Sequence, residues 1–148
     1  MAISQAIATS FKTELLNGIH AFGTPVVRPT ATPDVFKIAL YTSSAVLGAS
    51  TTEYSTDNEI SGPGYSAGGN VLTAIAPASS GTTAFLDFDD TTWTSSTITA
   101  NGALIYNSTQ ANRAVGVLAF GGDKAAMAGD FKIVFPPADA ANAIIRIV

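Results

Sequence analysis

The stretch Val35-Phe-Lys-Ile-Ala-Leu-Tyr41 carries a large apolar residue at every second position. Successive side chains of an extended chain point to opposite faces, so Phe36, Ile38 and Leu40 share one face. This pattern predicts a β-strand. Further runs rich in β-branched and aromatic residues predict strands over residues 71–76, 83–88, 97–100, 103–107, 114–120, 131–135 and 143–148.

Turn residues separate these runs. Asn101-Gly102 lies between two of them, and this dipeptide is the strongest short signal for a β-hairpin. Gly121-Gly122-Asp123 and Ala128-Gly129-Asp130 indicate another turn region. No alternation of strands with helices is visible, which argues against a parallel sheet. The sequence therefore predicts a mainly β fold, an antiparallel β-sandwich or a barrel, preceded by one helix.

The helix is predicted over residues 1–23. Apolar residues recur there every three to four positions, which gives one apolar stripe. The stripe consists of Ile3, Ile7, Phe11, Leu15, Ile19 and Phe22. Gly23 and Pro25 end the pattern. This helix either covers a face or edge of the sheet or docks on a neighbouring subunit, in which case Phe11, Leu15, Ile19 and Phe22 are contact residues.

Two segments without strand patterns complete the chain. Residues 24–34 carry three prolines and predict an extended linker. Residues 42–70, rich in Ser, Thr and Gly, predict a long loop, which is usually functional when it lies within a compact domain. The loop is interpreted either as a protein-contact surface or as a segment folded over its own sheet edge. Its candidate contact residues are Glu53, Tyr54, Asp57, Asn58, Glu59 and Tyr65.

The composition limits the partners. The 148 residues have the size of one domain, with the β-sandwich spanning residues 35–148. Only 12% of the residues are charged and 47% are hydrophobic, which favours an interface-rich protein. The net charge is -4 and the seven basic residues are scattered singly, so no nucleic-acid partner is expected. No apolar run is long enough to cross a membrane, and the N-terminus does not read as a signal peptide.

No catalytic constellation is recognisable, and neither an enzyme nor a cofactor is predicted. Cysteine is absent and His20 is the only histidine. No Gly-x-Ser-x-Gly motif accompanies this histidine, so a helix-end role is favoured. The segment Gly62-Pro-Gly64 lacks the Gly-Lys-Ser/Thr of a phosphate-binding loop.

An acidic cluster is the sharpest remaining feature. Asp87, Asp89 and Asp90 lie at the end of a predicted strand, with Asp87 and Asp89 on one face. A solvated strand face explains them without a ligand, while a calcium site is the alternative. Trp93, the only tryptophan, is expected to pack on the sheet, although a sugar-stacking role remains open.

Taken together, the strand and turn segments resemble those of a family of small virion proteins of tailed bacteriophages. The resemblance covers nearly the whole chain, and fold-forming residues carry it rather than a catalytic signature. The matching segments are Phe36-Lys-Ile-Ala-Leu-Tyr-Thr-Ser43, Asn58-Glu-Ile-Ser-Gly62, Gly64-Tyr-Ser-Ala-Gly-Gly69, Phe85-Leu-Asp-Phe88, residues 93–100, Gly102-Ala-Leu-Ile-Tyr-Asn107, Phe120-Gly-Gly-Asp-Lys124, residues 131–136 and Ala143-Ile-Ile-Arg-Ile147.

The resemblance implies a jelly-roll-like cement or decoration protein. Such a protein is made in the host bacterial cytoplasm, binds the major capsid protein on the outer surface of the shell, and self-associates as a dimer or trimer. A tail or neck role is an alternative within the same particle. A different class is a carbohydrate- or receptor-binding β-sandwich that uses Trp93 together with the cluster of Asp87, Asp89 and Asp90.

Overall fold

The computed structural model describes residues 2–16, 18–22 and 32–148. It confirms the predicted class, because the chain is mainly β, with two antiparallel sheets arranged as a β-sandwich and one short helix. In chain order the elements are β1 (Ala6–Ile7), α1 (Thr9–Leu16), β2 (Phe36–Tyr41), β3 (Asn70–Leu72), β4 (Ala74–Ser80), β5 (Thr83–Phe88), β6 (Thr91–Asn107), β7 (Arg113–Ile133) and β8 (Ile145–Ile147).

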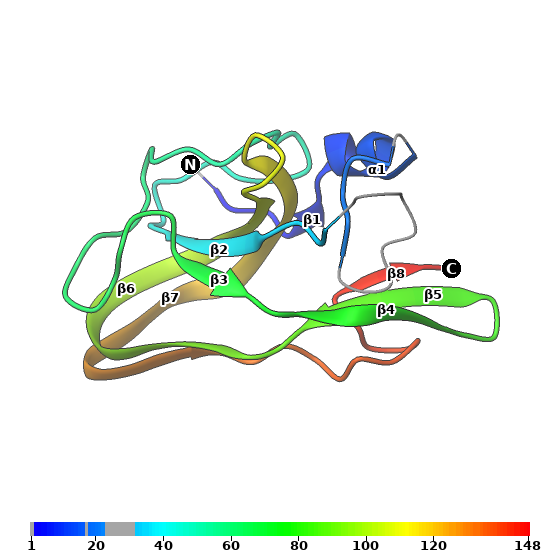
Figure 1. The fold of residues 1–148 in the computed structure, drawn as a ribbon. Helices are drawn as coiled ribbons and strands as arrows, with labels where there is room; N and C mark the ends of the chain where they lie inside the picture. Colours follow the sequence, from blue (N-terminus) through cyan, green and yellow to red (C-terminus); the bar gives the residue numbers. More distant parts are fainter. Residues whose placement is uncertain (1, 17, 23–31) are drawn as a thin grey trace.

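The larger sheet has the strand order β1-β7-β6-β2-β3, and the smaller sheet has the order β4-β5-β8. The chain passes between the sheets at three places, the third being residues 134–144 between β7 and β8 (Figure 1). Thr73 alone separates β3 from β4, and only Asp89 and Asp90 separate β5 from β6. Every strand pairing within the sheets is antiparallel.

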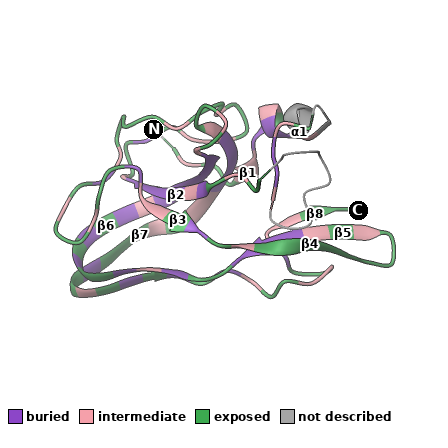
Figure 2. Cartoon of the chain, in the orientation of Figure 1, coloured by how far each residue is buried: buried purple, intermediate pink, exposed green. Residues whose placement is uncertain are grey.

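Strand β2 confirms the strand predicted from the opening alternation. It lies between β6 and β3, and all of its residues except Lys37 are buried. Two-sided burial explains why Ala39 and Tyr41 are as buried as the Phe36 face. In Figure 2 burial is concentrated around β2, whereas β4 is largely exposed. The centre of the core therefore lies in the larger sheet.

The predicted hairpin at Asn101-Gly102 is wrong, because β6 runs straight through these residues. Gly102 pairs with Tyr41 on one side and with Ala119 on the other. A Cβ atom on Gly102 would lie 2.6 Å from the Leu118 carbonyl oxygen. This glycine serves close packing inside the sheet rather than a turn. The β6–β7 connection instead lies at residues 108–112.

The glycines predicted to form a turn after residue 120 lie within β7. Residues 120–123 stand opposite Asn101 alone, which makes an enlarged β-bulge. Gly121 and Gly122 have φ angles of +74° and +151°, which favour glycine. The Asn101 amide donates a hydrogen bond of 2.8 Å to Asp123 Oδ1 across the bulge. The predicted strands 114–120 and 131–135 are thus largely parts of one bent strand.

The predicted helix over residues 1–23 is much shorter in the structure. Residues before Thr9 are extended, because Ala6 and Ile7 pair with β7. Residues 18–22 follow the helix without regular secondary structure. The apolar spacing was compatible with a helix, but the open edge of β7 satisfies the backbone of the first residues. Most of the predicted linker 24–34 lies outside the described residues, and residues 32–34 have no regular structure.

An aromatic cluster joins the N-terminal region to both sheets. The rings of Phe22 and Phe36 stack with centroids 4.1 Å apart, and both lie near Phe88 of β5. Phe11 of α1 meets Phe22 edge-on at 5.9 Å. The helix therefore packs on the core, as one of the two interpretations of its apolar stripe expected.

Candidate interaction surface

The long loop between β2 and β3 folds back over the larger sheet. Isolated bridges connect it to three other segments. They pair Leu47 with Ile3, Glu53 with Arg113, and Glu59 with Tyr41. The Ile60 amide also donates a hydrogen bond of 3.0 Å to the Leu40 carbonyl. The loop thus covers its own sheet, while its role in contacting another protein stays a prediction.

Glu59 holds this loop together. Its Oε2 accepts a hydrogen bond of 2.7 Å from the Tyr54 hydroxyl. Its Oε1 accepts bonds of 2.6 Å from the Tyr65 hydroxyl and 2.7 Å from the Gly68 amide. Bonds to a carboxylate are stronger than neutral ones. Burial, assisted by the bonds to Glu59, holds the pKa values of Tyr54 and Tyr65 well above their usual range.

The other two tyrosines extend the same network. The Tyr41 hydroxyl donates a 2.7 Å bond to the Ser55 carbonyl, and the Tyr106 hydroxyl donates one of 2.7 Å to the Gly68 carbonyl. The Tyr106 ring stacks on Tyr54 at 4.6 Å. Burial raises the pKa of Tyr106 to about 12. All four tyrosines of the chain therefore fasten the loop to the sheet.

The predicted contact residues of the loop divide into two groups. Glu53, Asp57 and Asn58 are exposed, so they are available to a partner. Tyr54, Glu59 and Tyr65 are half-buried within the network described above.

The predicted contact residues near the helix also differ in exposure. Phe11 is only 1% exposed, so in this structure its side chain packs in the core and is not accessible to a partner. Leu15 and Phe22 are partly buried against the core, and Ile19 is half-buried.

A groove that the sequence did not reveal lies along the second half of β7. It encloses about 500 Å³ and is lined by both apolar and polar side chains. Gln5, Lys124, Asp130 and Lys132 supply the polar lining, and Val134, which also lines the groove, is 68% exposed. The large apolar residues of the lining are Leu118, Phe120, Phe131, Ile133, Phe135 and Ile144. The alternation of Phe131, Ile133 and Phe135 was the available signal, but it predicted only a strand.

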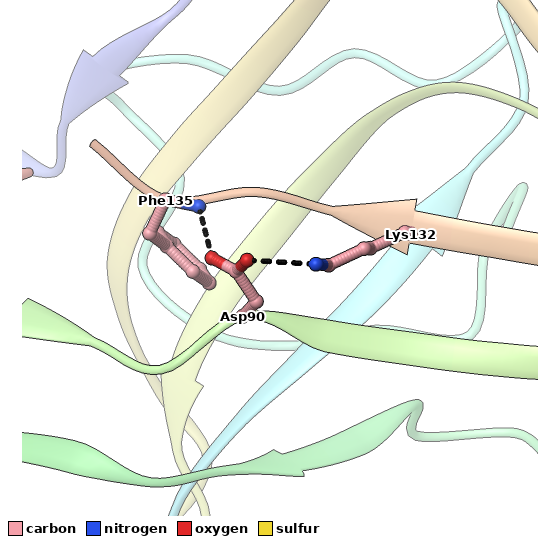
Figure 3. Close-up of polar contacts among 3 residues, drawn as sticks. All are labelled: Asp90, Lys132 and Phe135. Carbon is pink, nitrogen blue, oxygen red and sulfur yellow. Dashed lines mark hydrogen bonds and ion pairs between the residues drawn. The ribbon is translucent and has the colours of Figure 1, made fainter. Parts of the chain in front are cut away.

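An ion pair supports one wall of this groove (Figure 3). Lys132 Nζ lies 3.0 Å from Asp90 Oδ2, and the Phe135 amide donates a 2.9 Å hydrogen bond to Asp90 Oδ1. The bond from Lys132, together with that from Phe135, holds the pKa of Asp90 below its usual range. Asp90 thereby ties the start of β6 to the segment that leaves β7.

The three acidic residues proposed for calcium have separate structural roles. Asp87 is 1% exposed and accepts hydrogen bonds from the amides of Phe88 at 2.8 Å and Ile144 at 3.3 Å. The prediction of a solvated strand face is therefore wrong for Asp87, although Asp89 is exposed. Asp90 is engaged by Lys132. Among the described residues, no group of three or more acidic or histidine side chains is placed to hold a metal ion.

Trp93 lies inside the sandwich. It is 3% exposed, between Tyr65 and Phe131, each with a ring centroid 6.0 Å away. A sugar-binding module that uses this tryptophan needs an exposed indole face. The packing expectation for Trp93 is confirmed, and the burial argues against the carbohydrate hypothesis.

His20 belongs to a buried polar network. Asn107 Oδ1 accepts bonds from the amides of Thr109 and Gln110, which fixes the orientation of the Asn107 side chain. Asn107 Nδ2 then faces His20 Nδ1 at 3.0 Å and Asp34 Oδ2 at 2.8 Å. The Asn107 amide is a donor at this point, so His20 Nδ1 accepts. These contacts join the segment after α1 to the β6–β7 turn, a structural role that sequence spacing did not indicate.

The comparisons with known proteins add no relative. No protein-family model, curated protein or solved structure matches this chain. Within the described residues, no helix has the length and apolar character needed to cross a membrane.

Proposed function

We propose that this chain is a cement, or decoration, protein of a tailed-bacteriophage capsid that binds the outside of the shell formed by the major capsid protein. The resemblance of its strand and turn segments to small phage virion proteins supports this role. The structural observation that carries the proposal is the open, largely apolar groove along β7, which the exposed Val134 lines. An apolar recess open to solvent is typical of a binding surface.

The rigid loop supplies a second type of contact. Glu53 and Asp57 are exposed on a loop whose other side is fastened by the Glu59 network. A surface fixed before binding loses less conformational entropy when a partner docks. Basic groups on the shell suit these two carboxylates, and apolar side chains suit the groove.

The proposed mechanism is thermodynamic. A protein that binds the assembled shell, but not its dissociated subunits, stabilises assembly by mass action. At a free concentration of 100 times the Kd, each occupied site contributes about 2.7 kcal/mol. A dimer or trimer of the decoration protein would bind several neighbouring shell subunits at once.

Co-sedimentation with expanded, empty shells of the phage that encodes the chain tests this proposal. We expect the wild type to sediment with shells, and Val134→Glu to bind at least about tenfold more weakly, because a carboxylate would be desolvated in the groove. Val71→Glu is the matched control, since Val71 is 62% exposed on β3 and does not line the groove.

Two outcomes contradict the proposal. One is a wild-type protein that does not bind shells under any condition in which shells stay assembled. The other is density confined to the tail or neck when intact particles are imaged by cryo-electron microscopy, which would favour the alternative location.

A further inference from the structure

A second cavity, which we call the inner cavity, lies beneath β1 and beside the groove along β7. It holds about 270 Å³. Among the described residues that line it, Gln5 is the only polar one, and the others are aliphatic residues and a glycine. Ile7 of β1, Ile105 of β6 and Ile145 of β8 all belong to this lining. Both sheets therefore contribute to the inner cavity.

The inner cavity extends into the buried part of the sandwich. Ile105 and Val117, which line it, are 2% and 1% exposed. An apolar cavity of about 150 Å³ is already large enough to bind a benzene-sized molecule, and it stays dry because it offers water no hydrogen bonds. The atoms around such a void lack dispersion contacts that an apolar occupant would restore. The lining thus favours an apolar ligand.

The inner cavity adjoins the groove along β7. Gln5, Leu118 and Ile144 line both of them. The groove combines polar and apolar side chains, whereas the inner cavity is almost wholly apolar. Ligand sites in proteins are typically apolar, with a few polar groups that orient the ligand. A polar groove that adjoins an apolar cavity suits an elongated molecule with a polar head and an apolar tail.

Gln5 provides a hydrogen-bond donor where the groove and the inner cavity meet. The Ala119 amide donates a 3.3 Å bond to Gln5 Oε1, which identifies the oxygen end of this side chain. Gln5 Nε2 therefore keeps two hydrogens, and no described residue accepts either of them. An oxygen atom of a ligand would be a suitable acceptor for this group.

The charged groups of the groove also favour an acceptor on the ligand. Lys132 is paired with Asp90. Lys124 is exposed and forms no hydrogen bond or ion pair with the described residues. Asp130 has the opposite charge, but its Oδ1 accepts a 3.2 Å bond from the Ser95 amide, which occupies part of its hydrogen-bonding capacity. Lys124 is thus a second donor in the groove that a ligand oxygen can satisfy.

We propose that the inner cavity binds the alkyl tail of a fatty acyl group, whose carboxylate or ester carbonyl oxygen accepts hydrogen bonds from Gln5 and Lys124 in the groove. A free fatty acid and an acyl ester share this chemistry and differ in the charge of the head. The site does not depend on shell binding, because Val134, at which shell contact is tested, does not line the inner cavity. A chain that binds shells but no acyl group would contradict only this inference, and the reverse result would contradict only the proposed function.

Isothermal titration calorimetry of the free wild type tests the tail. We expect decanoate to bind at least about tenfold more tightly than hexanoate, because each buried methylene adds roughly fourfold to the affinity. Decyltrimethylammonium has a similar tail but a cationic head without an acceptor, so it should bind at least about tenfold more weakly than decanoate. Equal affinities in either comparison, or no binding of decanoate below its micelle-forming concentration, overturn the inference.

The head is tested with monodecanoylglycerol, a neutral ester of the same acyl chain. An affinity equal to or above that of decanoate would identify an acyl ester held through its carbonyl. A preference for decanoate that is lost in Lys124→Gln would identify a free fatty acid bound through its charge. A preference for decanoate that Lys124→Gln leaves unchanged would overturn the assignment of the head to the groove.

Methyl NMR of the wild type tests the position of the tail. Ile105 and Val117 line the inner cavity and are buried, so a molecule adsorbed on the surface does not contact them. Decanoate should shift the methyl signals of these two residues. It should leave unchanged the signals of Val71, which is 62% exposed on β3 and lines neither cavity. A shift at Val71 without one at Ile105 and Val117 would show surface adsorption and overturn the inference.

Gly116→Val fills the inner cavity from β7. An added Cβ at Gly116 would lie 3.6 Å from its nearest neighbours, in Ala6 and Ile7, so a side chain fits there. We expect the affinity for decanoate to fall at least about tenfold, because the valine occupies space that the tail needs. Gly129→Val is the matched control and should bind as the wild type, since Gly129 also lies in β7 but lines neither cavity. If Gly116→Val does not fold by circular dichroism, the methyl signals of the wild type decide the question. Unchanged affinity in a folded Gly116→Val overturns the inference.

Discussion

Regular strands are usually more buried than loops, but two regions of this chain show the opposite. They are the loop between β2 and β3 and the sheet β4-β5-β8. The loop has no strand of its own, yet Glu59 and the tyrosines connect it to β2 and β6 through short hydrogen bonds. The smaller sheet is regular, but six of the seven residues of β4 are exposed. Local stability follows buried contacts and satisfied hydrogen bonds rather than secondary-structure type. We therefore expect the loop to resist local unfolding better than the smaller sheet.

The largest expected difference in the free energy of unfolding is between alanine substitutions at two glycines with positive φ. Gly69, at the end of the loop, has φ +72°, and an added Cβ would overlap the carbonyl oxygen of Ile38. Gly81, in the turn between β4 and β5, has φ +59° and no atom within 4 Å of an added Cβ. Urea unfolding should show a loss of about 3 kcal/mol or more for Gly69→Ala and about 1 kcal/mol for Gly81→Ala. Equal losses would mean that the loop end is less tightly packed than the structure shows.

Removal of the Glu59 carboxylate is the next largest test. Glu59→Ala leaves two tyrosine hydroxyls and the Gly68 amide without their acceptor, which should cost about 2 kcal/mol of the free energy of unfolding. Glu53→Ala, at an exposed position, is the control and should change it by less than about 0.5 kcal/mol. Hydrogen exchange at the Ile60 and Gly68 amides should be faster in Glu59→Ala than in the wild type, and unchanged in Glu53→Ala. Unchanged exchange in Glu59→Ala would show that the loop is held by other contacts.

The smallest effect concerns Asp87, the buried anchor between β5 and the start of β8. Burial raises the pKa of its carboxyl, so the folded chain holds this proton more tightly than the unfolded chain. The resulting stabilisation is complete below the unfolded pKa of about 3.9 and is lost as pH rises through the folded pKa.

The free energy of unfolding, measured by urea titration from about pH 4 to neutrality, should therefore fall in the wild type relative to Asp87→Asn. Asp57→Asn, at an exposed carboxyl, serves as the control. Parallel pH profiles for the wild type and Asp87→Asn would contradict the assigned environment of Asp87.

Period-two patterns predicted much of the fold from sequence, because strands buried on at least one face need that alternation. Residues 83–88 match β5 at both ends, and the predicted strand 35–41 differs from β2 by one residue. Two errors in the strand prediction came from glycines. Asn101-Gly102 and Gly121-Gly122 carry turn chemistry, but here they permit close packing and a bulge within long strands. Only the neighbouring strands reveal which role a glycine has.

The candidate surfaces were less predictable than the strands. The loop 42–70 was recognised by its length and composition, yet the internal role of Glu59 depends on how the loop folds rather than on any spacing rule. The groove along β7 forms because this strand bends and because Ile144, which is distant in sequence from Leu118, lies beside it. Asp87 looked like a neighbour of Asp89 and Asp90, but its environment depends on the Ile144 amide, 57 residues away.

The position of Trp93 allows the docking of the loop to be followed by intrinsic fluorescence. Tyr65, which is fastened to Glu59, lies with its ring centroid 6.0 Å from the indole of Trp93. At this separation, light absorbed by the phenol is transferred to the tryptophan and emerges as indole fluorescence. Release of the loop would separate the two rings and restore tyrosine emission, so docking of the loop can be followed by fluorescence without any added label.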